Sequence, residues 1–569
     1  MLEEREEAPM VGGAGGARLG LVLVIAAIAA GCGGARGDGG DPATRWTGSG
    51  DGYDELVALF EEWRVFEQPD LRDGAPDYST AAMEEKKRGL GELQARLAGI
   101  DPGSWPVAEQ VDYHLVRAEM NGLDFNLRVL RSWARDPAFY ASVWTYQSDT
   151  PAHEGPTHHA LVELWTYDFP LSDEAAAKLT GELATIPPLL AQARDNLTGD
   201  ARELWEAGIG DLRAQAATLD ELKGRVADAG PELAEAVEAA HAATLDFVGW
   251  LEEQTPSKTA PSGIGKENYT WYLQNVHLVP LTWEDEVRLL ERELARAHAS
   301  LRLEEHRNRD LPELVAISSA EEYDRRANES VDKYLAFLER EDVLPMRDYM
   351  DAALRARIGR YVPPESRNFF RTAIHFEPMT LWTHFYHWWD LARMEADPHP
   401  SPIRRGPLLY NIFDSRAEGM ATGVEEMMMH TGLYDDNPRV REIVWIMLAQ
   451  RAARGLGSLW VHSNELTMKE ARDFHVEWTP RGWMREDLDL LGFEQLLYLR
   501  QPGYGTSYIT GKYLVEQLLM ERSKQLGEDF SLSRFYEEVD ELGVIPMSLI
   551  RWQLTGDDSE IRELTGGSR

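Results

Sequence analysis

Hydrophobic residues recur with the period of an α-helix along most of the chain from Tyr53 onward. In the stretch 53–66 (YDELVALFEEWRVF), four apolar residues fall on one stripe: Leu56, Leu59, Phe60 and Trp63. Residues spaced three, four and seven positions apart share one face of an α-helix. The stretches 82–100 and 201–230 repeat this spacing, whereas the strict alternation typical of strands is scarce. The pattern predicts a large all-α protein built from many helices.

Proline and glycine interrupt the helical pattern most clearly in 252–267 (EEQTPSKTAPSGIGKE). Because such residues end helices, this stretch predicts a boundary. It would separate an N-terminal helical half, 53–255, from a C-terminal helical half, 256–569. The chain shows no repeat of fixed period, so a solenoid is not expected. We expect a central cleft between the halves, with the functional site carried by the C-terminal half.

Residues 1–32 resemble the signal peptide of a bacterial lipoprotein. An apolar run, Leu19–Ala30, is too short to span a bilayer and suits the hydrophobic part of a signal peptide. It leads to Cys32, where the resemblance implies lipidation. The alternative is an ordinary secretory signal in which the cysteine is incidental. The acidic residues at 1–9 are unusual for a signal peptide, and translation that begins at Met10 would remove them. The Gly-rich stretch 33–52 predicts a flexible tether, so we expect an exported protein anchored in the cell envelope at Cys32.

The composition narrows the range of partners. The chain has 569 residues, of which 43% are hydrophobic, enough for a large core. Its 97 acidic and 58 basic residues give a formal net charge of −39, which repels the phosphate backbone of nucleic acids. Cys32 is the only cysteine, so no internal disulfide can form. The composition therefore argues against nucleic acid as a partner, and the N-terminal segment predicts the membrane as one.

Candidate chemistry is concentrated in 383–394 (THFYHWWDLARM). On a helix, His384, His387 and Asp390 would form one stripe, because residues three apart share a face. Imidazole nitrogens and carboxylate oxygens suit zinc, and a catalytic zinc takes three protein ligands and leaves one position open. The alternative is a hydrogen-bonded aromatic core in which the histidines are structural. The spacing alone leaves both interpretations open.

A third ligand is expected from 414–430 (DSRAEGMATGVEEMMMH). Glu418 precedes Gly419 and further small residues that would let another helix approach closely, and Glu425 follows two turns later. A carboxylate in a tightly packed helix pair must be neutral, paired or metal-bound. A rival pair on the same stretch is formed by Glu426 and His430.

Several scattered stretches resemble the bacterial family known as domain of unknown function 885. DPAFYASVW and GKENYTWYLQ are similar to its Asn/Asp-Pro-x-x-Tyr and Gly-x-x-x-Tyr elements. EGMATGVEE, RGLGSLWVH and RQPGYGTSYITGK are similar to its E-G-W-A-L-Y-A-E, R-L-x-x-D-x-G-x-H and P-G-Q-A-x-x-Y-x-x-G elements. The matching positions are Glu418, Gly419, Ala421, Glu425, Arg454, His462, Pro502, Gly503, Tyr508 and Gly511. The resemblance implies a helical, exported, zinc-peptidase-like protein with a gluzincin-like fold.

The chemical centre of that family is H-E-x-x-P-G-H, and here this place holds HFYHWWD. His384 fits the first histidine, and Asp390 falls where the second belongs. Phe385 replaces the glutamate that takes a proton from the attacking water, and Ser458 replaces the aspartate of the element before His462. Positioned acid–base groups contribute about 10² to 10⁴ in rate, so the loss at position 385 bears directly on activity.

Two functions follow from the resemblance and these departures. In the first, a metal-dependent hydrolase of short peptides binds zinc through His384, His387, Asp390 and Glu418. Its base would be Asp390, Glu377 or Glu425, and His462 and Tyr508 would donate to the developing oxyanion. In the second, the chain keeps the fold, has lost peptide hydrolysis, and serves as an envelope lipoprotein that binds short peptides or other small molecules. A purely structural lipoprotein is a third interpretation.

Three of the candidate residues have plain structural alternatives. His462 precedes a helix that Ser463 or Asn464 could cap, which would place it at the surface. Tyr508 could be a packing aromatic at a helix entry. Arg500 could bind a substrate carboxylate through two hydrogen bonds, or could form an ordinary surface ion pair.

Overall fold

The structure is a computed structural model that describes residues 46–147, 158–410 and 414–566. The predicted signal peptide and its Cys32, and most of the predicted tether, lie outside the described residues. Within the described part, no helix combines the length and the apolar character needed to cross a membrane. The predicted fold class is confirmed, because the described chain is mainly α-helical.

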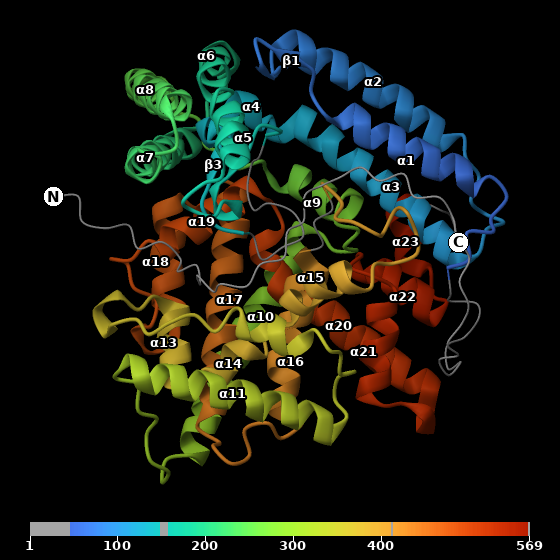
Figure 1. Ribbon diagram of the computed structural model, residues 1–569. Coiled ribbons are helices and arrows are strands. Elements are labelled where there is room, and N and C mark those ends of the chain that lie inside the picture. The colour runs from blue at the N-terminus through green and yellow to red at the C-terminus, as the bar shows by residue number, and fades with distance from the viewer. Residues whose placement is uncertain (1–45, 148–157, 411–413, 567–569) are drawn as a thin grey trace.

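The helices before residue 256 form the upper layer in Figure 1, with α1–α3 on one side and α5–α8 on the other. Their bounds are α1 (Tyr53–Glu67), α2 (Thr80–Ala98), α3 (Val107–Phe125), α4 (Ser132–Arg135), α5 (Asp173–Leu183), α6 (Ile186–Asn196), α7 (Arg202–Arg225) and α8 (Pro231–Gln254). Two small strand pairs accompany them, β1 (Leu71–Arg72) antiparallel to β2 (Ala75–Pro76) and β3 (Val143–Trp144) parallel to β4 (Val162–Glu163).

The later helices form the lower body of the molecule (Figure 1). They are α9 (Lys266–Asn275), α10 (Trp283–Arg307), α11 (Ala320–Glu341), α12 (Met350–Arg355), α13 (Phe369–Phe376), α14 (Met379–Trp382), α15 (Tyr386–Ala396), α16 (Asp414–His430), α17 (Val440–His462), α18 (Met468–Trp478), α19 (Leu490–Arg500), α20 (Tyr504–Leu526), α21 (Leu532–Glu541), α22 (Met547–Thr555) and α23 (Ser559–Thr565). Short 3₁₀ or π turns lie at Asn126–Leu130, Pro137–Tyr140, Leu164–Thr166, Thr255–Ser257, Pro364–Ser366, Pro480–Gly482 and Gly527–Asp529.

The hydrophobic stripes predicted from the sequence face the interior. In α1 the four predicted apolar residues are all buried, and the stretches around 82–100 and 201–230 form α2 and α7. A contiguous core runs from Tyr53 in α1 to Ile561 in α23, so the parts before and after residue 256 share it. Asp112 of α3 pairs with Arg404, and Tyr53 contacts Ser401, which ties these parts further. The boundary at 255/256 and the central cleft stay predictions.

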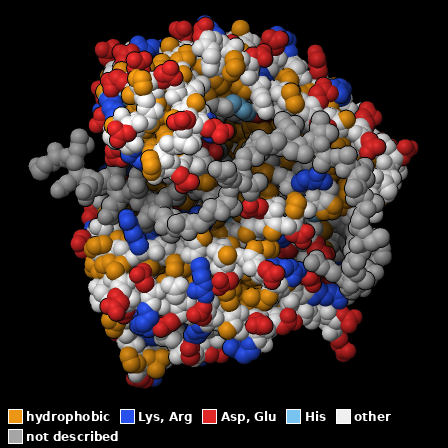
Figure 2. Space-filling view, in the orientation of Figure 1, with side chains coloured by type: hydrophobic (Ala, Val, Ile, Leu, Met, Phe, Trp, Pro, Cys, Tyr) orange, Lys and Arg blue, Asp and Glu red, His pale blue; other side chains and the backbone are white. Residues whose placement is uncertain are grey.

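On the face shown in Figure 2, acidic, basic and apolar side chains are interspersed. An open pocket of about 510 Å³ is lined by Phe376, Trp483, Arg439 and their neighbours. Its charged residues pair with one another. Arg439, for example, contacts Glu442 at 3.1 Å and Glu313 at 2.9 Å.

The crossing of α16 and α20 brings backbone against backbone. A Cβ added at Gly419 would lie 2.3 Å from the Cα of Gly511, and one at Gly511 would lie 2.0 Å from the carbonyl oxygen of Ser415. Neither position can hold a side chain unless a helix moves. Farther along α20, a Cβ added at Gly455 of α17 would lie 2.8 Å from the carbonyl oxygen of Gly505. The close helix approach predicted from the small residues after Glu418 is therefore confirmed.

We expect Gly419→Ala to lower the free energy of unfolding by about 1–3 kcal/mol or more, because its methyl group would overlap backbone atoms of α20. Thermal and denaturant unfolding measure the effect. Gly423→Ala on the same helix is the matched control, since a Cβ there meets only side-chain carbons at 3.8 and 4.0 Å. That control should be neutral or slightly stabilising through higher helix propensity. Equal stability of the two variants would contradict the tight crossing.

A buried carboxyl in α10 makes stability depend on pH. Burial raises the pKa of Glu286 from 4.5 to about 7, although the hydroxyls of Thr510 and Tyr269 contact its two oxygens and oppose this shift. As pH rises from about 4.5 to about 7, the unfolded chain loses this proton before the folded chain does. The contribution of Glu286 to stability therefore falls across that window.

Relative to the unaltered chain, Glu286→Gln should gain stability as pH rises from 4.5 to 7, and the difference should be constant above pH 8. The expected gain is about 1.4 kcal/mol for each unit by which the pKa is raised. Melting temperatures between pH 4.5 and 8.5 measure it, with Glu291→Gln, at an exposed position on α10, as the control. Parallel curves for the unaltered protein and Glu286→Gln would contradict the raised pKa.

Candidate metal centre

His384 lies on a turn. Residues 383–385 connect α14 to α15, and the backbone N–H of His384 bonds the carbonyl of Leu381 at 3.0 Å. The ψ angle of Phe385 is 16°, which takes the chain out of helical geometry at this point. The single helix predicted over 383–394 is therefore wrong in its first turn.

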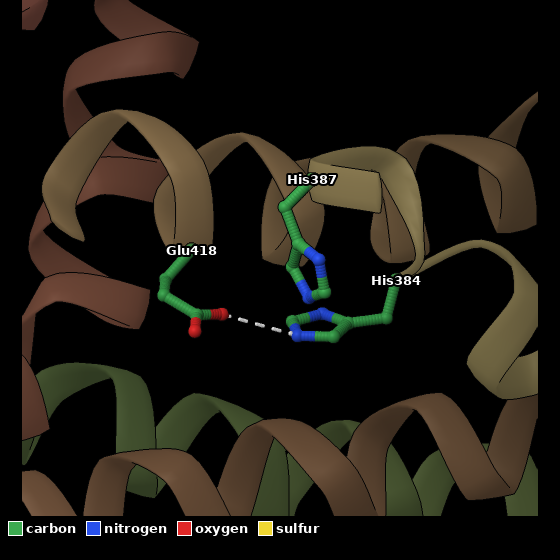
Figure 3. Close-up of side chains that lie close together, drawn as sticks. All are labelled: His384, His387 and Glu418. Atoms are coloured by element: carbon green, nitrogen blue, oxygen red, sulfur yellow. Dashed lines mark ion pairs between the residues drawn. The ribbon is translucent and has the colours of Figure 1, made fainter. Parts of the chain in front are cut away.

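Three of the four predicted ligands meet in the interior. Nε2 of His384 lies 3.2 Å from Oε2 of Glu418, and a nitrogen of His387 joins them, so that the three ligand atoms lie within 4.8 Å of one another. The two imidazole rings meet edge to face with centroids 5.2 Å apart. Figure 3 shows the two histidines converging beside the carboxylate of Glu418. All three side chains are buried, and we call them the ligand cluster.

Glu418 lies on α16 and is held in place by a residue of α20, the helix that crosses α16. The hydroxyl of Tyr504, the first residue of α20, donates to Oε1 of Glu418 at 2.8 Å. This bond leaves the other oxygen directed at His384. The glycine contact between α16 and α20 thus sets the distance between the side chains of Glu418 and Tyr504.

A contact at Nδ1, the ring nitrogen that does not face Glu418, fixes the orientation of His384. Nδ1 lies 2.9 Å from Oε1 of Glu425, and Arg451 of α17 donates to both oxygens of Glu425 at 2.6 and 2.7 Å. Arg451 also lies 3.2 Å from Nδ1, but the shorter contact and the opposite charge favour donation from Nδ1 to Glu425. A carboxylate on the far nitrogen is the common arrangement behind a metal-binding histidine. It directs Nε2 toward Glu418.

The electrostatics of the cluster favour a positive charge. Burial and the charge of Arg451 lower the pKa of His384, but Glu425 and Glu418 outweigh them and raise it above its usual value. Burial raises the pKa of Glu418, whereas the contacts with His384, His387 and Tyr504 bring it well below its usual range. The carboxylates on the two sides of the His384 ring therefore favour a positive charge in the ligand cluster.

The donor set fits zinc. Two imidazole nitrogens and one carboxylate oxygen form a known catalytic zinc set, with bonds of about 2.0–2.1 Å. Tetrahedral ligands at that bond length lie about 3.3 Å apart, which is close to the 3.2 Å between His384 and Glu418. His387, Glu418 and Nε2 of His384 would hold the ion, and Glu425 and Tyr504 would support them.

Asp390 does not belong to the ligand cluster. Its carboxylate lies 3.1 Å from Arg416 and 2.7 Å from Arg393, and Arg416 also contacts Asp540 at 3.2 Å. The guanidinium of Arg416 is fully buried and comes from α16, the helix that carries Glu418. The predicted metal role of Asp390 therefore has no support in the geometry, because both of its oxygens neutralise arginines.

Phe385 stands where the family motif has its proton-transferring glutamate, and its surroundings are apolar. Phe385 is half-buried against neighbouring aromatic rings. Among the alternatives, Glu425 is paired with its arginine, and Asp390 lies in the network just described. Glu377 lies 3.6 Å from Arg326, and burial raises its pKa. Each carboxylate proposed for the base role therefore already has a partner inside the protein.

Tyr508 lies beside the ligand cluster. Its ring stacks on the ring of His384 with centroids 6.1 Å apart and an interplanar angle of 14°. The guanidinium of Arg454 lies 3.9 Å from the centre of the same ring. Tyr508 thus does pack at a helix entry, and it also forms part of the wall of the candidate site.

Two other predicted residues are engaged within the fold. His462 is fully buried, its Nε2 lies 2.8 Å from the carbonyl of Tyr498, and burial lowers its pKa to about 4. The surface alternative for His462 is therefore wrong, and the residue is not among the three that converge. Arg500 pairs with Asp136 at 2.8 Å and Asp211 at 2.6 Å. Its guanidinium ties α19 to the N-terminal part of the chain, which supports an ion pair for Arg500, although the pair is largely buried and not at the surface as the alternative had it.

The rival pair on α16 belongs to an ion network. Glu426 accepts from Arg296 at 2.7 Å and from Lys512 at 3.0 Å, and exposed His430 lies 3.4 Å away. The network stabilises the charge of Glu426, so it offers no carboxylate in need of a metal.

Sequence reasoning missed Arg451 and Tyr504. A charged residue inside the otherwise apolar run VWIMLAQRAARGLG, in α17, is a signal that Arg451 needs a buried acidic partner. Tyr504 had no comparable signal, because its role depends on which residue of α16 it meets across the crossing.

The comparisons agree with the resemblance seen in the sequence. The sequence matches a family described as "Bacterial protein of unknown function (DUF885)" over residues 65–342 and 387–554. The chain belongs to this family. The unmatched interval, 343–386, contains His384 and Phe385, and the match resumes at His387. Of the three residues of the ligand cluster, His384 thus lies outside the matched residues, and His387 and Glu418 lie within them.

Two solved structures have the same fold. One is a protein from Shewanella oneidensis described as a "putative lipoprotein of unknown function", with a TM-score of 0.65 and 16% identity over 88% of this chain and 97% of that one. The other is a "putative lipoprotein" from Colwellia psychrerythraea, with a TM-score of 0.62 and 14% identity over 89% of this chain and 99% of that one. No curated protein matches the sequence at a significant level. At these identities the likeness shows the fold alone.

Asp390→Asn should lower the free energy of unfolding by about 3 kcal/mol, because it removes one of the two carboxylates that neutralise the guanidinium groups of Arg416 and Arg393 and leaves only Asp540 to pair with both. Bound zinc should stay unchanged, since Asp390 lies outside the ligand cluster. Denaturant unfolding and metal analysis measure the two effects, with Glu395→Gln, exposed on the same helix, as the control. Loss of zinc without loss of stability would show that Asp390 is a ligand after all.

Proposed function

We propose that this protein is a zinc-dependent hydrolase of the bacterial cell envelope that acts on short peptides. The convergence of His384, His387 and Glu418 within 4.8 Å carries the proposal. A bound zinc ion supplies a Lewis acid that polarises a carbonyl group and activates water. The order of family elements in the sequence supports the assignment to peptides.

The chain's own residues would position the reacting groups. Glu425 and Arg451 fix the ring of His384, and Tyr504 fixes the carboxylate of Glu418. The ring of Tyr508 covers one side of the His384 ring. The low exposure of these groups favours strong electrostatic interactions, because water does not screen them.

The envelope location rests on two observations. The N-terminal sequence has the order expected of a lipoprotein signal, with an apolar run before Cys32. The two proteins of the same fold are described as putative lipoproteins. We therefore place the protein at a membrane surface, held by a lipid on Cys32.

A metal-holding binding protein that does not cleave peptides is the second candidate function. The specific observation in its favour is Phe385, which puts an apolar ring where the family carries its proton-transferring glutamate. The pairing of Glu425 with Arg451 strengthens it, because both carboxylate oxygens of Glu425 already accept hydrogen bonds from the guanidinium.

Metal analysis of protein prepared without a His tag is the first test. We expect about one equivalent of zinc, because one set of three ligands binds one ion. In His384→Ala, which removes one of the three ligands, the zinc content should fall below about 0.2 equivalents. His430→Ala, at an exposed histidine on α16, should keep its zinc. Zinc content that is low in the unaltered protein, or equal in both variants, would exclude the metal site.

The second arm of the test separates the two functions. Peptide-library digestion should show zinc-dependent cleavage that disappears in Glu418→Ala. Equal cleavage by the unaltered protein and Glu418→Ala would identify a contaminant. A rise in melting temperature with peptide, together with bound zinc and no turnover, would favour the binding protein over the hydrolase.

A further inference from the structure

Arg454 of α17 is a buried cation with unused hydrogen-bonding capacity. Its side chain is 1% exposed, and Nη1 pairs with Glu494. Among the residues that the structure describes, Nε and Nη2 have no hydrogen-bond partner. No other buried arginine in the described part of the chain leaves two nitrogens without a partner. Leaving a buried donor unsatisfied is costly, most of all when the group is charged.

Nε and Nη2 lie along the same edge of the planar guanidinium group. Nε–H and one Nη–H of an arginine point in parallel, which is the arrangement that binds both oxygens of a carboxylate. Lysine cannot reproduce this geometry. The unused capacity of Arg454 is therefore specific for a flat anion with two oxygens.

The group lies next to the ligand cluster. Its Cζ is 3.9 Å from the ring centre of Tyr508, the same ring that stacks on His384. The rings of Tyr498 and Phe370 lie at 5.5 and 6.0 Å, so the guanidinium is enclosed by aromatic faces. One turn farther along α17, the hydroxyl of buried Ser458 also has no partner among the described residues. Two residues with unsatisfied polar atoms thus lie one turn apart on the same helix.

The formal charges around Arg454 and the ligand cluster would be balanced by one bound anion. The carboxylates of Glu418, Glu425 and Glu494 carry a formal charge of −3, and Arg451 and Arg454 carry +2. With a divalent cation in the ligand cluster, the sum becomes +1. A bound carboxylate would bring the buried region to neutrality, which is the favoured state in a medium of low dielectric constant.

We propose that Arg454 binds the C-terminal carboxylate of a short peptide through Nε and Nη2, and so selects peptides with a free C-terminus. This inference rests on the proposed function, because it places a peptide beside the ligand cluster. It assigns to Arg454 the substrate-binding role that the sequence suggested for Arg500.

Binding of matched peptides tests the proposal. We would measure melting temperature and calorimetric affinity with trialanine, trialanine amide, and an Ala-Glu-Ala amide that carries its only carboxylate on a side chain. Each is measured with the zinc-loaded and the zinc-free protein. Trialanine should bind about tenfold or more tightly than its amide, as expected for hydrogen bonds to a charged group. Comparable binding of the Glu-containing amide would overturn the selection of a C-terminus.

Ser458 provides a matched pair of variants. Ser458→Asp places a carboxylate four residues from Arg454 on the same helix face, where it can occupy the guanidinium from within. Because this internal ion pair competes with the carboxylate of the peptide, the Ser458→Asp variant should lose the preference for trialanine over its amide. Ser458→Asn adds similar volume without charge and should keep the preference. Arg454→Lys is the further variant, and it should lose the preference because lysine lacks the paired donors.

The outcomes separate this inference from the metal function. A preference for the free acid that disappears in Ser458→Asp supports the carboxylate site, even if the protein holds no zinc. Equal binding of trialanine and its amide, or no binding of either to the zinc-loaded protein, overturns it. A preference that persists in both Ser458→Asp and Arg454→Lys would also overturn it, since another group would then hold the carboxylate.

Discussion

Backbone contact between α16 and α20 is the constraint on which the candidate site depends. Glycines at 419 and 511 let the two helices meet with no side chain between them. The residue before the first glycine is Glu418, and the residue that begins α20 is Tyr504, which binds it. Tyr508 follows one turn later and stacks on His384. A separation wider by one methyl group would disconnect the carboxylate from its tyrosine and both from the histidine.

Buried arginine–carboxylate pairs hold the surroundings of this crossing. Arg451 binds Glu425, Arg454 binds Glu494, Arg416 binds Asp390, and Arg404 binds Asp112. Pairs of this kind add little net stability, because both ions must leave water, but breaking one is costly. Their effect is to fix side-chain positions. In this interior they fix the turn that carries His384, through Glu425, and the middle of α15, through Asp390.

The helices and the close approach at Gly419 could be predicted because local patterns determine them. Leu56, Leu59, Phe60 and Trp63 had to share a helix face, and small residues after Glu418 had to admit a neighbour. The convergence of His384 with Glu418 was foreseen from residue types and the order of family elements. The arginine partners of Asp390 could not be foreseen, because Arg416 lies on another helix and Asp540 lies 150 residues later in the chain. The turn at His384 was hidden by a sequence that has the composition of a continuous helix.

That turn has a consequence for the recognition of such sites. In zinc helices the spacing of two histidines along the chain fixes the distance between them, so a written motif can find the site. Here the backbone leaves the helix between the two histidines, and contacts from α16 and α17 set the position of His384. Relatives that have drifted in the same way would keep the arrangement in space while their spacing along the chain changed. Searches by side-chain geometry across structures would therefore recover members of this family that searches by sequence pattern leave out.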